Sequence, residues 1–181
     1  LLSDMAPTFL EAAGLDIPNE MTARSLMDLF TGSEASSRDA AFTAMERHDG
    51  CREGGKGYPT RAVRTHDFLY IRNYEPDRWP SGDPDAGKCA RAIPFGEVDS
   101  SPTKSLLMDN ATEPDFREFH RLAFGMRSAE ELYDLRLDPG QITNVASHPD
   151  YADARRDLSN RLQQYTARTG DPRALGVEAP W

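Results

Sequence analysis

The sequence is poor in the features that mark several classes of protein. Its 181 residues include only two cysteines, Cys51 and Cys89, and these show none of the Cys/His spacings of a zinc site. No apolar run approaches the length of a membrane-spanning helix. Positive charge is also scarce, with 21 Lys and Arg against 30 Asp and Glu and a net charge of -9. An acidic chain repels phosphate backbones, which argues against nucleic-acid binding through bulk electrostatics.

The few cysteines leave the redox state of the chain open. Cys51 and Cys89 both fall in loop-like stretches, so a disulfide is compatible with the sequence but is not required by it. We expect two free thiols. No signal peptide opens the chain, which begins at Leu1 without Met and runs directly into a helix signal. We therefore expect a fragment of a longer protein.

What the sequence does contain is enough for one ordinary domain with a core, because 38% of the residues are apolar. Leu158 and Leu162 share one face of a predicted helix over residues 149–166, and a turn at residues 66–67 joins two strands into a hairpin. The sequence predicts an α+β fold, in which a small antiparallel sheet of about four strands has a C-terminal helix packed on it. The alternating and short apolar runs predict strands at residues 41–45, 61–65, 68–73 and 131–135.

Capping residues mark the expected helix ends. Asp4 is expected to cap the first helix, and Gly14 is expected to end it in a left-handed conformation. Ser101 opens a short helix, with proline next to it. Ser147 and Asp150 form a capping-box signal before the C-terminal helix.

The helix predicted over residues 112–124 has no assigned function. Phe116, Phe119 and Ala123 are expected to share its buried face. This arrangement leaves His120 on the exposed face, where we assign it no role.

Two arginines and a tryptophan have a structural interpretation that we prefer to a functional one. Arg61 and Arg64 alternate with apolar residues, and we expect them to form a polar strand face that pairs with Asp67 or Asp134. Trp79 lies in a proline-rich loop, where its ring can stack on a sugar. A tryptophan that pins a long loop to the core is the more common arrangement.

Three segments, in order and over nearly the whole chain, carry motifs that resemble the C-terminal region of the sulfatases. The resemblance departs at Ala23, where glycine is usual. The segments are DMAPTFLEAAG at 4–14 with ARSL at 23–26, YPTRAVRT at 58–65 running into FLYIRN at 68–73, and ELYDL at 131–135 with DP at 138–139 and NVA at 144–146.

Three further features are similar to the sulfamidase-like, or heparan N-sulfatase-like, branch of the family. They are Glu46-Arg47-His48, the Tyr-Pro-x-Arg strand, and the run NYEPDRW at 73–79. The resemblance implies that residues 1–32 are the tail of the sulfatase catalytic domain. It implies that residues 33–181 are the C-terminal subdomain, with an irregular insertion at 74–130.

The resemblance also implies the chemistry of the parent enzyme. Such an enzyme hydrolyses sulfate esters or sulfamates of glycosaminoglycan-like sugars, using calcium and a formylglycine made from a Cys/Ser-x-Pro-x-Arg motif. Neither Cys51 nor Cys89 lies in this motif, and the metal carboxylates are expected upstream of Leu1. We therefore expect no nucleophile, no metal site and no turnover in this chain alone. Its implied partners are the N-terminal catalytic domain and a sulfated sugar, and its implied location is periplasmic, secreted or lysosomal.

The candidate site is the predicted strand end at Glu46, Arg47 and His48. In the sulfamidase-like family this strand end faces the substrate pocket, and the segment that follows is rich in glycine. His48 is expected to bond a sugar hydroxyl or sulfamate or to assist proton transfer, Arg47 to pair with a sulfate or carboxylate, and Glu46 to accept bonds from sugar hydroxyls. The structural alternative is a solvated strand end.

Two other functions remain open at this point. One is a non-catalytic α+β domain that binds glycans or a partner protein. The other is a phosphodiesterase or phosphonate hydrolase of the same superfamily, which the formylglycine motif would not separate cleanly from a sulfatase. The upstream sequence distinguishes the first from an enzyme, and substrate assays distinguish the second.

Overall fold

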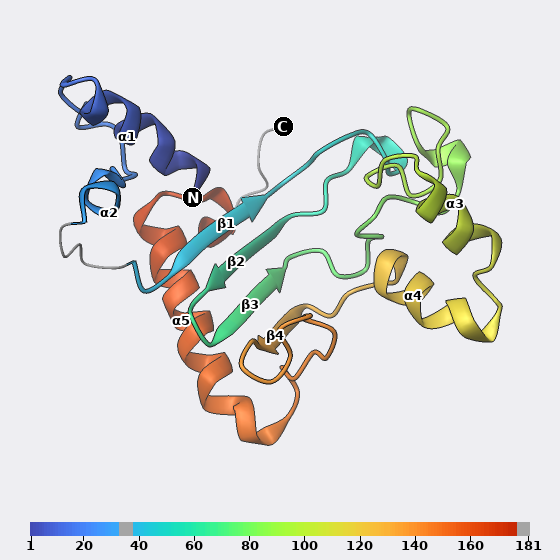
Figure 1. Ribbon diagram of the computed structural model, residues 1–181. Helices are drawn as coiled ribbons and strands as arrows, with labels where there is room; N and C mark the ends of the chain where they lie inside the picture. The colour runs from blue at the N-terminus through green and yellow to red at the C-terminus, as the bar shows by residue number, and fades with distance from the viewer. Residues whose placement is uncertain (33–37, 177–181) are drawn as a thin grey trace. The chain divides into compact units, whose positions relative to one another are not determined.

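The computed structural model describes residues 1–32 and 38–176 of the chain (Figure 1). It consists of two compact units, Leu1–Ala41 and Phe42–Trp181. The predicted domain boundary after residue 32 adjoins residues 33–37, which lie outside the described residues.

The first unit contains two short helices, α1 at Met5–Ala12 and α2 at Met27–Thr31, after a 3-10 turn. The prediction that Asp4 caps α1 is wrong, because its backbone is already helical and its side chain makes no capping bond. The buried Asp4 carboxylate instead accepts a hydrogen bond from Arg38 Nη2 at 2.7 Å. Gly14, with φ of 71°, follows the helix in the left-handed conformation that was expected.

Thr8 fixes the chain that follows α1. Its hydroxyl donates to the Asp4 carbonyl oxygen at 2.6 Å and accepts from the Leu26 backbone N–H at 2.9 Å. The side chain is 4% exposed. One hydroxyl thus joins the helix to the turn before α2, which explains why a polar residue is buried here.

The second unit is built on one four-stranded sheet in the order β1-β2-β3-β4. The β2–β3 and β3–β4 pairs are antiparallel, and the register aligns Val63 with Tyr70 and Tyr70 with Leu132. All four predicted strands are confirmed, with ends shifted by at most one residue. The strands are β1 at Ala41–Met45, β2 at Thr60–Arg64, β3 at Phe68–Asn73 and β4 at Glu130–Asp134.

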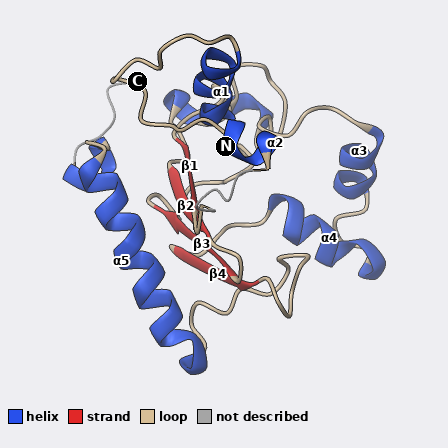
Figure 2. Ribbon diagram, turned by 60° about the vertical axis from the view of Figure 1, so that its left-hand side comes forward, coloured by secondary structure: helices blue, strands red, loops and turns tan. Residues whose placement is uncertain are grey.

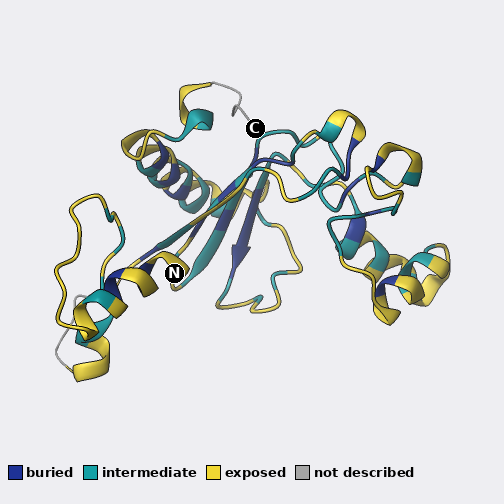
Figure 3. Cartoon of the chain, turned by 90° about the horizontal axis from the view of Figure 1, so that it is seen from above, coloured by how far each residue is buried: buried dark blue, intermediate teal, exposed yellow. Residues whose placement is uncertain are grey.

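Helix α5, Ala152–Arg168, covers one face of this sheet (Figure 2). Its buried stripe contains Leu158 and Leu162, as predicted, and it faces the strands in the view from above (Figure 3). Tyr165 adds a ring stacked on Phe42 of β1, with centroids 3.8 Å apart. The α+β fold with a C-terminal helix packed on a small antiparallel sheet is therefore confirmed.

The start of this helix differs from the capping box that the sequence predicts. A 3-10 turn at Pro149–Tyr151 precedes α5, and the residue that caps this turn is His148. Its ring Nδ1 accepts from the Asp150 backbone N–H at 3.3 Å. The predicted role of Ser147 is wrong, because the turn begins one residue later.

The segment between β3 and β4 contains helices α3, Pro102–Asp109, and α4, Pro114–Phe124. The Ser101 hydroxyl accepts from the Lys104 backbone N–H at 3.1 Å, which confirms the predicted start of α3. No helix in residues 1–32 and 38–176 is long and apolar enough to cross a membrane.

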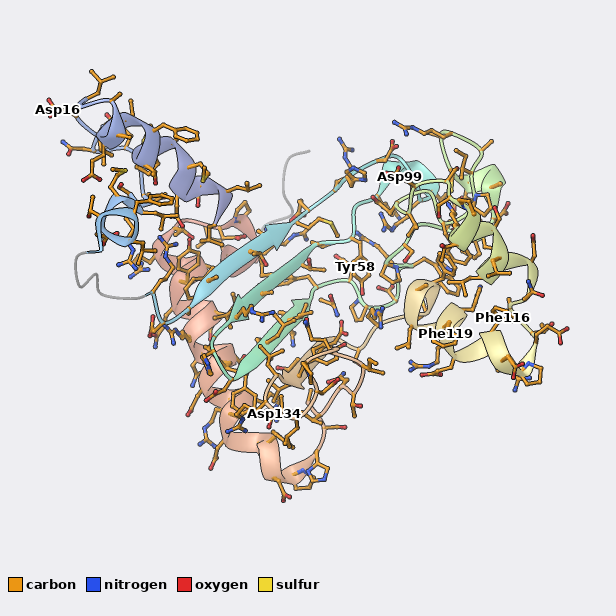
Figure 4. All side chains as sticks on the ribbon, in the orientation of Figure 1. Asp16, Tyr58, Asp99, Phe116, Phe119 and Asp134 are labelled. Atoms are coloured by element: carbon orange, nitrogen blue, oxygen red, sulfur yellow. The ribbon has the colours of Figure 1, made fainter. Side chains whose placement is uncertain are left out.

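The buried face of α4 includes the half-buried Phe116 and Ala123, as predicted, but not Phe119. Phe119, which Figure 4 labels on α4, is 59% exposed, whereas Phe124 is 1% exposed. Phe124 stacks on Phe95, and His120, expected to be exposed, packs against both rings. His120 and Phe124 are four residues apart and therefore lie on the same face of α4. This face is buried because the Phe95 ring, from outside the helix, packs against it.

Candidate functional site

The three predicted site residues follow β1 directly, but their side chains have different surroundings. The Glu46 side chain is 14% exposed and accepts hydrogen bonds from two arginines. Arg47 is exposed and makes one long bond to the Gly55 carbonyl oxygen, at 3.5 Å. The His48 side chain is 65% exposed. Of the three, Arg47 and His48 are therefore open to a ligand, and Glu46 is committed within the fold.

Glu46 belongs to an ionic cluster of two acids and two arginines. Its carboxylate accepts from Arg61 Nη2 at 3.0 Å and from Arg173 Nε at 2.9 Å. Arg61 also donates to both oxygens of Asp171, at 2.5 Å and 3.0 Å. Such bidentate contacts fix geometry as well as charge. The cluster ties the end of β1 to β2 and to the chain after α5.

The partners of Arg61 were predicted wrongly. The sequence favoured Asp67 or Asp134, but Arg61 is 5% exposed and turns inward, to Asp171. Asp134 is instead held by Arg136 at 2.7 Å. Burial by itself raises the pKa of Asp171, but the hydrogen bonds and charge of Arg61 outweigh it, so this pKa lies below its usual range.

The His48 ring is oriented by a carboxylate that the sequence did not reveal. His48 Nδ1 lies 2.9 Å from Glu97 Oε2, and the Glu97 side chain is only 10% exposed. An ionised carboxylate can only accept, so we assign the proton to Nδ1. No described residue bonds Nε2. The ring is therefore held by one nitrogen and presents the other to a ligand.

Glu97 is itself held by the buried Arg52. Arg52 Nη1 donates to Glu97 Oε1 at 2.8 Å, so the two carboxylate oxygens face Arg52 and His48 separately. The same guanidinium donates to the carbonyl oxygens of Trp79 and Pro80, each at 2.7 Å. One buried cation thus fixes the loop after β1 to the segment after β3. A buried charge of this kind is tolerated because its donors are satisfied.

The backbone around Glu97 is also fixed from α3. Lys104 is 6% exposed, and its ammonium group donates to the carbonyl oxygens of Phe95 and Val98, at 2.9 Å and 2.7 Å. These carbonyls flank Glu97 in the chain. A Cβ at Gly96 would lie 2.6 Å from Cys51 Sγ, so only glycine fits there. The position of Glu97 is therefore set by packing and by hydrogen bonds.

Trp79 fixes the same segment by its ring. The ring packs edge-to-face on Phe95, with centroids 6.0 Å apart. This is the loop-pinning arrangement that the sequence analysis preferred to stacking on a sugar.

The two thiols take no part in this site. Cys51 and Cys89 are free and buried, which confirms the expected free state. Burial raises the pKa of both thiols, so the nucleophilic thiolate is disfavoured. Within the described part of the chain, no group of three or more His, Cys, Asp and Glu is placed to hold a metal ion. The described residues therefore do not fit the formylglycine or the calcium that the resemblance implies.

Sequence reasoning missed Arg52 and Glu97. They are 45 residues apart in the chain, and Glu97 lies in an irregular stretch without periodicity. Asp171 is separated from Arg61 by 110 residues. No spacing rule connects such pairs, because their contact exists only after the sheet, α3 and α5 have packed.

Comparison with known proteins gives a consistent result. Residues 2–84 match the family model described as N-sulphoglucosamine sulphohydrolase, C-terminal. An ulvan-active sulfatase from Formosa agariphila is 27% identical over 169 residues, which cover 93% of this chain and 25% of that protein. The chain therefore spans about a quarter of that relative's length.

Two solved structures share the fold. A 2-O GAG sulfatase matches 93% of this chain and 25% of its own, with a TM-score of 0.58 and 20% identity. A phosphonate monoester hydrolase of Agrobacterium radiobacter matches 91% of this chain and 24% of its own, with a TM-score of 0.52 and 21% identity.

The predicted α+β fold is thus shared with solved structures of a sulfatase and of a phosphonate monoester hydrolase, and the sequence is similar to an ulvan-active sulfatase over 93% of the chain. The closer relation to sulfamidases stays a prediction. The substrate contacts of Glu46, Arg47 and His48, and the cofactors and location of the parent enzyme, stay predictions as well.

Proposed function

We propose that this chain is the C-terminal subdomain of a longer protein, a sulfatase. This parent enzyme hydrolyses sulfate esters or sulfamates of glycosaminoglycan-like sugars. The observation that carries the proposal is a likeness to sulfatases over 93% of the chain, found both in sequence and in fold. In the parent, an N-terminal catalytic domain supplies the formylglycine and the calcium. The enzyme acts in the periplasm, in a lysosome or outside the cell.

The contribution of this chain is part of the wall that binds the sugar. His48 offers Nε2 to a hydroxyl or sulfuryl oxygen of the substrate, and Arg47 beside it offers a guanidinium to a sulfate or carboxylate. Support comes from the exposure of both side chains and from the anchoring of the imidazole by Glu97. Glu46 acts indirectly, because its carboxylate holds the strand end through Arg61 and Arg173.

Two rival functions have less support. Phosphonate monoester hydrolases share the fold, but likeness at this level of identity concerns the fold alone. The sequence likeness to an ulvan-active sulfatase favours sulfate chemistry. A non-catalytic domain that binds glycans or a protein would account for the fold. It would not account for the sequence similarity to an enzyme, the ulvan-active sulfatase.

The test is a substrate assay on the complete gene product that carries this chain. We expect calcium-dependent release of sulfate from an aryl sulfate and from sulfated oligosaccharides, and much slower cleavage of phenyl phosphonate esters. Preference for the phosphonate would favour the rival hydrolase. A complete product without a Cys/Ser-x-Pro-x-Arg motif and without turnover on either substrate would contradict the proposal.

A further inference from the structure

A polar pocket lies on the α5 side of the sheet. Its volume is about 300 Å³, at the lower end of the range for small-ligand sites. His48, Glu97 and Arg52 do not line it. The walls come from β3, from the residue after β3, from α5 and from the turn after α5, through Tyr70, Arg72, Tyr74, Ser159, Gln163 and Arg173.

The lining is unusual in its polarity. Ligand pockets are mostly apolar, but here Leu162 and Ala174 are the aliphatic residues among the lining. Gln163 is exposed and contributes an amide that both donates and accepts. The Tyr74 hydroxyl is neutral at neutral pH, as that of any ordinary tyrosine is, and it can both donate and accept a hydrogen bond.

The two arginines of the pocket differ in how closely their guanidinium groups are paired with carboxylates. Arg173 is bonded to Glu46 and lies 3.9 Å from Glu75, so its charge is compensated. Arg72 Nη1 is 3.9 Å from Glu130 Oε1, beyond hydrogen-bonding distance, and its side chain is 42% exposed.

Glu130 has other partners as well. Its Oε1 accepts from the Tyr70 hydroxyl at 2.6 Å, and its Oε2 lies 3.8 Å from Arg155 Nη1. A guanidinium has five N–H donors, and those of Arg72 are the least committed charged donors among the lining residues. The pocket can therefore hold an anionic group at Arg72.

We propose that this pocket binds an anionic monosaccharide unit, at a site separate from the His48 loop. Its carboxylate or sulfate bonds Arg72, and its hydroxyls bond Gln163 and Tyr74. Binding at this site requires no turnover. Its test is therefore independent of the proposed function and can be made on this chain.

The experiment is an NMR titration of the 181-residue chain with glucuronate and with glucose 6-sulfate, and with glucose and inorganic sulfate as comparisons. We expect saturable shifts at Tyr74 and Gln163 with at least one anionic sugar, and about tenfold weaker binding of glucose and of sulfate alone. The two anionic sugars distinguish a carboxylate site from a sulfate site.

The variant Arg72→Gln should lower the affinity for the anionic sugar about tenfold, because a charge-assisted bond is lost. Arg64→Gln is the matched control, since it removes the same charge from an exposed position on the adjacent strand. Far-UV circular dichroism confirms that both variants fold. Equal losses in the two variants, equal binding of glucose or sulfate, or no saturable shift at Tyr74 and Gln163 would each overturn the proposal.

Discussion

His48 Nδ1 lies 2.9 Å from Glu97 Oε2, so a nearly buried carboxylate orients an imidazole that is mostly exposed. Arg52 holds the other oxygen of Glu97. The arrangement places a single nitrogen of His48 at the disposal of a ligand.

The role of Glu97 can be tested by the tautomer of His48. In Glu97→Gln the carboxylate that accepts from Nδ1–H is lost, so we expect a larger share of the Nε2–H tautomer. Nitrogen-15 shifts of the ring, measured well above the ordinary imidazole pKa, report this share.

The control for this measurement is Asp67→Asn beside His66, an exposed pair with 97% and 46% of the side chains accessible. We expect little change at His66, because solvent competes with that contact. An unchanged tautomer at His48 in Glu97→Gln would show that Glu97 does not position the ring.

The isolated chain should not turn over any substrate. Its described residues form no metal cage, and neither buried thiol lies in the formylglycine motif. Assay of the purified chain with an aryl sulfate, with and without calcium, checks this expectation. Metal-dependent turnover that disappears when one of its own residues is changed would refute it.

Asp171 should make stability depend on acid pH. Burial raises the pKa of Asp171 in the folded state, but Arg61 lowers it by more, so the folded pKa lies below the unfolded one. The ionised carboxylate therefore contributes fully to the free energy of unfolding above the unfolded pKa of about 4. The contribution is lost as the pH falls through the folded pKa. Asp171→Asn should cost roughly 2 kcal/mol at neutral pH, and less in acid.

Urea unfolding at neutral pH and in acid measures both values. Asp157→Asn on α5 is the control, because its side chain is 75% exposed. We expect that variant to match the parent chain at either pH. A cost for Asp171→Asn that is the same in acid would contradict the linkage.

Removal of the hydroxyl should change the free energy of unfolding differently at two buried tyrosines. Tyr58 Oη is buried without a hydrogen-bond partner among the described residues, whereas the Tyr70 hydroxyl donates to Glu130 at 2.6 Å. Tyr58→Phe should be neutral or slightly stabilising, and Tyr70→Phe should cost about 1 kcal/mol. Urea unfolding of the two variants side by side measures the difference, and a larger cost at Tyr58 would contradict it.

The same tyrosines set an alkaline limit. Burial is the main cause that raises the pKa of both Tyr58 and Tyr70 to about 12. The folded state therefore holds their protons more tightly than the unfolded state, and stability falls as the pH rises from about 10 towards 12. Absorbance of tyrosinate against pH should show these groups titrating late and together with unfolding.

The sequence predicted the parts of this fold that depend on local periodicity. Burial alternates in period two along β2, and Leu158 and Leu162 follow the helical period, so this strand and α5 were predicted closely. His120 and Phe119 exchanged roles because the partner ring of Phe95 comes from outside α4. Periodicity shows that a helix has a buried face, but the residues that pack against the helix determine which of its side chains lie on that face.

The candidate site was predicted less completely, for a related reason. The position of His48 follows from the end of β1, which local pattern reveals. Its anchor Glu97 is 49 residues away, in a segment without regular structure. The Glu46 carboxylate is paired with Arg173, which is 127 residues away in the chain. Long-range ion pairs form only in the folded chain, and a single sequence carries no local signal for them.

The most direct test of the account is the variant His48→Ala in the complete sulfatase that we propose to carry this chain. A lost bond to a charged group is worth about 1.5–3 kcal/mol, so kcat/KM on the sulfated sugar should fall about tenfold to hundredfold. A small aryl sulfate touches little of this wall and should lose far less. His66→Ala, at a 97% exposed position, is the control and should leave both rates unchanged. Equal loss on the two substrates, or no loss on either, would contradict the assignment of His48 to the sugar-binding wall.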